Sequence, residues 1–242
     1  MKFCRWILLS VTLSGACIAD PNDQTITLGY NSYPPYKIKL TDDKAGGLVL
    51  APFEDAFTKA GLAFVWQEMP HARQIAQVRY NTSKFCAVGM YKTPEREAFG
   101  KYTNVIYKAS PFLVVTNRQS ENGDSRPSLN ELFGSRVNSV VLVLSKSYGS
   151  ELDTLIESAR STVSYADNDL MIINMLAHNH GQYTLFEYDK IDYFRKSGVW
   201  DDSRLVSYSP KDAPRGENWY AICSKKVDDA TIEKINKFLP GK

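Results

Sequence analysis

Short apolar segments of strand and helix type alternate along residues 25–90, and this alternation constrains the fold more than any other feature. Residues 25–30 are rich in β-branched side chains and predict a strand, and residues 63–66 and 85–90 predict two more. Between them, apolar residues at near-helical spacing over 48–60 and 72–80 predict two helices, the first ended by Gly61. This βαβαβ order implies an α/β fold with a mostly parallel sheet.

The same architecture returns in the second half of the chain without a repeat of the sequence. An extended stretch at 105–115 leads into a polar loop at 117–127. Ser128 is the expected cap of the helix that follows, and Asp167 or Asn168 caps a later one. We therefore predict two α/β lobes that meet at a cleft. The predicted strands of this half are 137–144, 162–165, 183–188 and 219–223, and its helices are 129–133, 149–159, 170–176, 189–196 and 227–239.

Residues 1–19 have the composition of a secretory signal peptide. Lys2 and Arg5 form its basic part and residues 7–16 its apolar part, with cleavage expected after Ala16 or Ala19. The apolar part is shorter than the roughly 20 residues that span a bilayer, so we expect a soluble mature chain in the periplasm. A lipid anchor at Cys17 is the less favoured alternative, because the usual aliphatic residue three positions upstream is lacking.

Charge and cysteine content narrow the class of protein. Removal of residues 1–19 takes away two basic residues and no acids, which leaves 27 of each sign. A neutral chain without a basic run argues against a nucleic-acid partner. Cys86 and Cys223 remain as an even pair in an oxidising compartment, which favours a disulfide over two buried thiols. The three histidines are not at metal-ligand spacing, so we expect neither a metal nor a cofactor.

The segment 89–100, Gly-Met-Tyr-Lys-Thr-Pro-Glu-Arg-Glu-Ala-Phe-Gly, places an arginine in the first turn of a helix that follows a strand. Thr93 suits the N-cap and Pro94 the first helical position. Arg96 opposes the helix dipole at a cost of roughly 0.3–1 kcal/mol, which suggests an anionic partner. We interpret Arg96 as a clamp for a ligand carboxylate. The alternative is a solvated side chain paired with a neighbouring glutamate.

Three further motifs accompany this segment: Tyr-Pro-Pro-Tyr at 33–36, Pro-His-Ala-Arg at 70–73 and Ser-Tyr-Gly at 147–149. Their order resembles the type II periplasmic solute-binding proteins of family 3, which include the polar amino-acid binders. The resemblance implies a two-lobe fold whose chain crosses between the lobes twice, through a hinge near 105–115 and 219–225. Lobe I would comprise 20–109 and 218–242, and lobe II 110–217.

The resemblance also assigns ligand contacts to the strand ends that face the cleft. Tyr91 stands where amino-acid binders commonly have a small hydroxyl residue, which puts the standard pose of an α-amino acid in doubt. Structural alternatives remain: a rigid turn for Tyr33, a helix cap for Asp189 and an ordinary turn at 147–149. Either Glu187 or Asp189 would bind a ligand ammonium group. The predicted ligand-binding set is Tyr33, His71, Gly89, Tyr91, Arg96, Tyr148, Gly149, Glu187 and Asp189.

The resemblance favours a binding protein over an enzyme. Two lobes would close over a small polar, carboxylate-bearing ligand such as an amino acid, and the monomeric protein would deliver it to an inner-membrane ABC permease or to a sensor protein. The alternative is a periplasmic enzyme of the cyclohexadienyl dehydratase type on the same fold. Glu187 or His71 would then supply the general acid.

Overall fold

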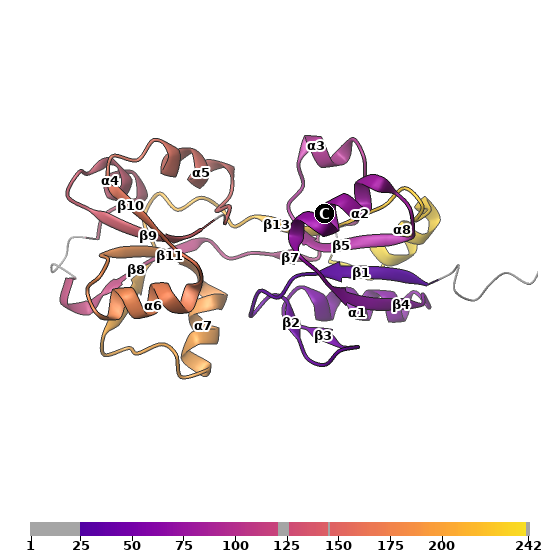
Figure 1. Cartoon of the computed structure of the whole chain (residues 1–242), viewed down its shortest axis with the longest axis horizontal. Coiled ribbons are helices and arrows are strands. Elements are labelled where there is room, and N and C mark those ends of the chain that lie inside the picture. Colours follow the sequence, from indigo (N-terminus) through magenta and orange to yellow (C-terminus); the bar gives the residue numbers. More distant parts are fainter. Residues whose placement is uncertain (1–24, 121–125, 145, 241–242) are drawn as a thin grey trace, which may run out of the picture.

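The computed structural model describes residues 25–120, 126–144 and 146–240, so the predicted signal peptide lies outside the described residues. Two sheets, each with helices on both faces, form separate lobes that two segments of chain connect (Figure 1). This arrangement confirms the predicted two-lobe α/β fold. No helix within the described ranges has the length and apolar character that crossing a membrane requires.

The sheet of lobe I has the strand order β4-β1-β5-β13-β6, and β7 also pairs with β13. Strands β4, β1 and β5 are parallel, and β13 runs antiparallel to each of its neighbours. A short hairpin of β2 and β3 lies beside this sheet. The strands are β1 (Ile26–Tyr30), β2 (Ile38–Lys39), β3 (Ala45–Gly46), β4 (Phe64–Glu68), β5 (Phe85–Met90), β6 (Lys101–Tyr102), β7 (Tyr107–Lys108) and β13 (Asn218–Cys223).

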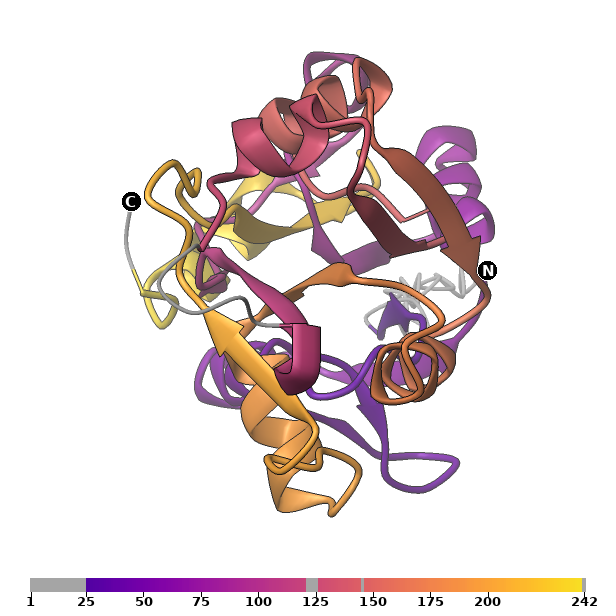
Figure 2. The ribbon, with the colours of Figure 1, turned by 90° about the vertical axis from the view of Figure 1, so that its left-hand side faces the viewer.

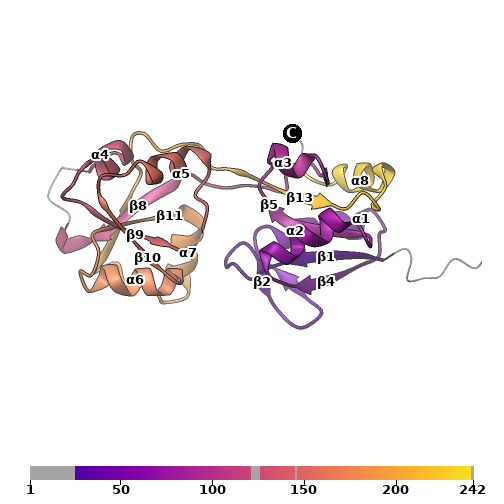
Figure 3. The same cartoon turned by 45° about the horizontal axis from the view of Figure 1, so that its top comes forward.

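Side chains of β5 alternate between the two faces of this sheet, as the strand period of two requires. Cys86 and Val88 pack in a core with the helices α1 (Leu50–Lys59) and α8 (Asp229–Asn236). Phe85 and Ala87 face the other way, toward α2 (His71–Tyr80). The short helix α3 (Pro94–Glu97) follows β5 and is drawn above α2 in the view of Figure 3.

The sheet of lobe II has the order β10-β9-β11-β8-β12, in which β8 runs antiparallel to both of its neighbours. Helices α4 and α5 pack on one face and α6 and α7 on the other, as Figure 2 shows. The elements are β8 (Phe112–Asn117), a 3-10 helix at Arg118–Ser120, α4 (Leu129–Gly134), β9 (Ser139–Val143), α5 (Ser150–Glu157), β10 (Thr162–Ala166), α6 (Asp169–Ala177), β11 (Tyr183–Glu187), α7 (Tyr188–Lys196) and β12 (Leu205–Tyr208).

The structure confirms the predicted caps. Ser128 forms a capping box with Glu131 at the start of α4, and Asn168, the second of the two candidates, caps α6. The hydroxyl of Thr93 accepts a hydrogen bond from the backbone of Arg96 at the start of α3. The hairpin of β2 and β3, the two-residue β6 and the edge strand β12 were not predicted. The extended stretch at 105–115 divides into β7 and the start of β8.

The two crossing segments run side by side between the lobes (Figure 1). The backbone N–H of Ala109 donates to the carbonyl of Glu217 at 3.0 Å, and that of Ile106 donates to Trp219 at 2.8 Å. Gly216 allows this close approach, because a Cβ there would lie 1.8 Å from the carbonyl oxygen of Ala109. The crossings thus form a narrow two-stranded connection.

The predicted disulfide is present between Cys86 and Cys223, which face each other across β5 and β13. Both residues are fully buried in the core of lobe I. The bridge spans 137 positions of sequence and ties the strand that returns from lobe II to the sheet it joins.

Candidate functional site

A cavity of about 420 Å³ lies at the meeting of the two lobes. Lobe I supplies residues that follow β1, begin α2 and end β5, and lobe II supplies the turn after β9. Because these are the carboxyl ends of parallel strands and a helix start, the position is the usual one for a ligand of an open α/β sheet. The lining residues are Asn31, Tyr33, Lys37, His71, Gly89, Met90, Tyr91, Arg96, Leu144, Lys146, Ser147 and Trp219.

The backbone between β5 and α3 fixes the position of Arg96. Its Nη1 donates to the carbonyl oxygen of Tyr91 at 2.9 Å, and the same oxygen accepts from the hydroxyl of Tyr102 at 3.1 Å. The flanking glutamates pair elsewhere, Glu95 with Arg79 and Glu97 with Lys92. The described contacts therefore do not pair Arg96 with either neighbouring glutamate. Its remaining guanidinium N–H groups are left to serve a planar anion.

Trp219 forms an aromatic wall on one side of the cavity. The ring of Tyr33 stacks against it at a centroid distance of 6.3 Å, and the ring of Tyr91 meets it edge to face at 5.8 Å. Gly89 permits this packing, because its φ of +77° suits glycine and a Cβ there would crowd Lys37 and Trp219. Tyr33 is therefore a stacked turn residue whose side chain also lines the cavity, and its contact with a ligand stays a prediction.

Lys37 is the most deeply buried cation in the cavity wall, with 4% of its surface exposed. Its Nζ donates to the side-chain oxygen of Asn31 at 2.8 Å. Burial lowers the pKa of Lys37 to about 7. His71 stands nearby at the start of α2, where burial and the positive charges of Arg96 and Lys37 lower its pKa to about 4. His71 is therefore neutral at pH 7.

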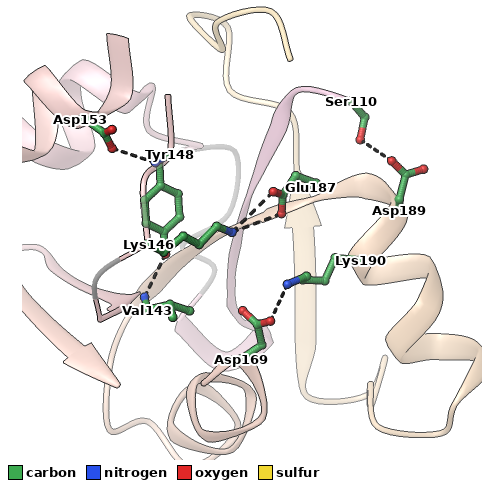
Figure 4. A network of polar contacts seen from close by, with 9 residues as sticks. All are labelled: Ser110, Val143, Lys146, Tyr148, Asp153, Asp169, Glu187, Asp189 and Lys190. Atoms are coloured by element: carbon green, nitrogen blue, oxygen red, sulfur yellow. Dashed lines mark hydrogen bonds and ion pairs between the residues drawn. The ribbon is translucent and has the colours of Figure 1, made fainter. Parts of the chain in front are cut away.

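Lobe II contributes two ion pairs, each of a lysine and an acid, and one of these lysines, Lys146, also lines the cavity (Figure 4). Lys146 lies 3.5 Å from both carboxylate oxygens of Glu187, and Lys190 pairs with Asp169. The Nζ of Lys190 also lies 3.7 Å from the ring centre of Tyr33, so the ion pairs of lobe II contact the aromatic wall of lobe I. Burial and the charge of Lys146 lower the pKa of Lys190 to about 8.

Asp189, predicted as one of two candidates for an ammonium group, belongs to the hinge. Its Oδ2 accepts hydrogen bonds from the hydroxyls of Tyr107 and Ser110, both on the first crossing segment. These contacts hold the start of α7 to the connection between the lobes (Figure 4). Asp189 does not line the 420 Å³ cavity, and Glu187 is already paired with Lys146. Neither carboxylate lines this cavity, and both have partners among the described residues, so a contact with a ligand ammonium stays a prediction.

Tyr148 and Gly149 lie beside the cavity and not in its wall. The hydroxyl of Tyr148 accepts a hydrogen bond from the backbone of Val143, and its backbone N–H donates to Asp153 (Figure 4). With Glu187 these residues line a neighbouring space of about 20 Å³, which holds about one water. The structure thus gathers Tyr33, His71, Gly89, Tyr91 and Arg96 from the predicted set.

Seven lining residues were not in that set: Asn31, Lys37, Met90, Leu144, Lys146, Ser147 and Trp219. The sequence motifs could have pointed to these positions. All of them except Trp219 lie within or a few residues from the motifs at 33–36, 89–100 and 147–149, and Trp219 lies at the start of the returning strand β13. Among the described residues, no group of three or more histidine, cysteine, aspartate or glutamate side chains could hold a metal ion. The wall is therefore cationic and aromatic.

Comparisons with known proteins identify the family and the fold. The family described as bacterial extracellular solute-binding proteins, family 3, matches residues 26–240. No curated protein matches the chain.

Solved structures similar in fold include ytmK of Bacillus subtilis, a probable amino-acid ABC transporter extracellular-binding protein (TM-score 0.69, 16% identity, covering 89% of this chain and 90% of that one). The ancestral amino acid-binding protein AncCDT-1, a precursor of cyclohexadienyl dehydratase, is also similar (TM-score 0.66, 13% identity, covering 90% of this chain and 88% of that one). A third similar structure is the BvgS VFT2 domain of Bordetella pertussis (TM-score 0.66, 17% identity, covering 90% of this chain and 87% of that one).

Proposed function

The chain belongs to the bacterial extracellular solute-binding proteins of family 3, and on that premise we propose that it binds a small carboxylate-bearing solute in the periplasm. The observation that carries the proposal is Arg96, a cavity-lining guanidinium whose neighbouring glutamates are paired elsewhere. A bidentate arginine–carboxylate pair is the interaction that such a group makes best. The stacked rings of Tyr33 and Trp219 would enclose the body of the ligand.

We propose that the two lobes, 20–109 with 218–242 and 110–217, close over the ligand by bending at the crossing segments. Asp189 and its hydroxyl donors at Tyr107 and Ser110 would guide that motion, because they join α7 to the connection. The monomeric closed form would be presented to an inner-membrane ABC permease or to a sensor protein. A gene for a permease or for a receptor beside the gene of this protein would distinguish transport from sensing.

A binding role agrees better with the contacts than a dehydratase role. Glu187, one of the two residues considered as a general acid, is paired with Lys146 and lies outside the wall of the large cavity. His71 is neutral at pH 7, so it cannot donate a proton as an imidazolium. Chromatography of a ligand recovered after prolonged incubation with the protein checks this point: unchanged ligand is expected, and steady conversion would support the enzyme.

The function is tested with mature protein that has been unfolded and refolded to remove carried ligand. A thermal-shift panel of amino acids, dicarboxylates, aromatic acids, amines and sugars is expected to give a shift with carboxylated compounds. Ligand at about 100 times its dissociation constant adds about 2.7 kcal/mol to the free energy of unfolding. No shift with any carboxylated compound would contradict the proposal.

Two variants connect the shift to the site. Arg96→Gln is expected to weaken binding by about 100-fold or more, because losing a charge-assisted bidentate pair costs about 3 kcal/mol. Arg79→Gln is the matched control, since Arg79 is exposed, pairs with Glu95 and does not line the cavity. Equal affinities of Arg96→Gln and the wild type would remove Arg96 from the site.

A further inference from the structure

The wall of the large cavity has an uneven charge. Its described residues include three cations, Lys37, Arg96 and Lys146, and no aspartate or glutamate. An α-amino acid carries an ammonium beside its carboxylate, and such a group needs an acid or several acceptor oxygens when water is excluded. The charge of the wall is therefore that of a site for anions.

Lys37 is the first cation without a balancing charge. The only hydrogen bond of its Nζ among the described residues goes to the neutral amide of Asn31, and none of their carboxylates lies within ion-pair distance. A buried ammonium in this state is costly unless a counter-charge arrives. The antiparallel bridge between Tyr33 and Lys37 holds the backbone of this residue in place, so the side chain is directed at the cavity by local structure.

Arg96 is the second cation in the cavity wall without a balancing charge. Its described side-chain hydrogen-bond partners are the backbone carbonyl of Tyr91 and the hydroxyl of Tyr102, neither of which carries a net charge. The glutamates on either side of it are occupied by Arg79 and Lys92. Arg96 therefore also presents an uncompensated positive charge to the cavity.

The third cation is already balanced. Lys146, with 11% of its side chain exposed, pairs with Glu187, with 3% exposed. Three further acids of lobe II near the site have partners: Asp169 pairs with Lys190, Asp189 accepts from two hydroxyls and Asp153 accepts from Ser147 and the backbone of Tyr148. Glu151 and Glu217 line the neighbouring small space and not this cavity. With this pair neutral, Arg96 and the ammonium form of Lys37 are the cations of the wall that have no carboxylate partner among the described residues.

We infer that the ligand is a small dicarboxylate without a free ammonium group, with one carboxylate on Arg96 and the other on Lys37. This inference rests on the proposed function and narrows its ligand class. A dianion balances the two open charges, whereas an amino acid would place its ammonium among cations in a wall that offers it no carboxylate. The cavity volume of about 420 Å³ is within the range of small-molecule sites.

The test is isothermal titration calorimetry of refolded wild-type protein at pH 7 with compounds matched in size. Glutarate and L-glutamate differ by the ammonium group alone, and butyrate lacks the second carboxylate of glutarate. Succinate, L-aspartate and propionate repeat the comparison with a shorter chain. In at least one of the two series, the dicarboxylate is expected to bind at least tenfold more tightly than its amino-acid and monocarboxylate counterparts.

Lys37→Met supplies the second arm of the experiment. It is expected to weaken dicarboxylate binding at least tenfold and to remove the preference for the dicarboxylate over the monocarboxylate. Lys92→Met is the control, because Lys92 is exposed, pairs with Glu97 and does not line the cavity. Circular dichroism verifies that each variant is folded, and Lys37→Gln replaces Lys37→Met if the latter is not.

The outcomes separate the two claims. Tighter binding of an amino acid than of either dicarboxylate would overturn the inference and leave the proposed function in place. Equal affinities of wild type and Lys37→Met for the dicarboxylate would also overturn it. If no carboxylated compound of this set or of the wider panel binds, both claims are wrong.

Discussion

Replacing Lys37 by methionine should make the ligand-free protein more stable. The buried ammonium has a pKa of about 7 in the folded protein against 10.5 in its ordinary state, so the unfolded chain binds more protons between these values. At pH 7 this difference corresponds to about 4 kcal/mol of lost stability. Methionine has a similar unbranched shape. Losing the hydrogen bond to Asn31 lowers the stability of the variant by about 1–2 kcal/mol, which reduces the gain. The net gain at pH 7 is therefore about 2–3 kcal/mol.

The pH dependence distinguishes this cause from a general packing effect. Wild-type stability should rise as pH increases from 7 to 10.5, because over this range the unfolded chain holds a proton on Lys37 that the folded protein has already lost. The gain from Lys37→Met should therefore be largest at pH 7, about 5–10 °C in melting temperature, and should vanish near pH 10. Circular dichroism melts at the two pH values, with Lys92→Met as the control, measure it. A variant less stable than wild type at pH 7, or a gain that is equal at both pH values, would refute the reasoning.

Two further predictions concern the scaffold. Cys86→Ala, or reduction of the bridge to Cys223, should lower the free energy of unfolding by up to about 5 kcal/mol, because the bridge closes a loop of 137 positions. Two titratable thiols in denatured, unreduced protein would contradict the bridge. Gly149→Ala should cost about 1–3 kcal/mol, since φ is +96° and the new Cβ would lie 3.0 Å from Oε1 of Glu217. Urea unfolding measures it, and a change below about 0.5 kcal/mol would show that the turn adjusts freely.

The fold was largely predictable because its elements carry strong local signals. The apolar pattern of β1, β5 and β9, and the caps at Thr93 and Ser128, depend on residues close in sequence. The edge strand β12 has only four residues, and the hairpin of β2 and β3 has two residues in each strand, so neither shows enough alternation to be detected. β12 exists through its pairing with the distant strand β8, whereas β2 and β3 pair only with each other.

The site was less predictable, because the partners of its charged groups are chosen by tertiary structure. Arg96 was found from a local conflict between its charge and the helix dipole. Asp189 was one of two candidates for a ligand ammonium, with a helix cap as the alternative; its observed donors, Tyr107 and Ser110, lie 82 and 79 positions away in sequence and could not be foreseen. Lys37 was missed because a lysine after a turn is usually exposed, and its burial follows from packing against Gly89 and Trp219.

Proton uptake on binding tests the central claim most directly, since it reports the charge of Lys37 when an anion enters the cavity. The measurement is calorimetric titration with glutarate, or with succinate if that binds more tightly, at pH 7.5 in buffers of different ionisation enthalpy. With a pKa of about 7, Lys37 is mostly neutral at this pH in the free protein and becomes charged beside a carboxylate, whereas His71 stays neutral. We predict uptake of about 0.7 proton for each ligand bound by the wild type and at most about 0.2 by Lys37→Met. Binding without proton uptake, or with equal uptake in the two proteins, would contradict the account.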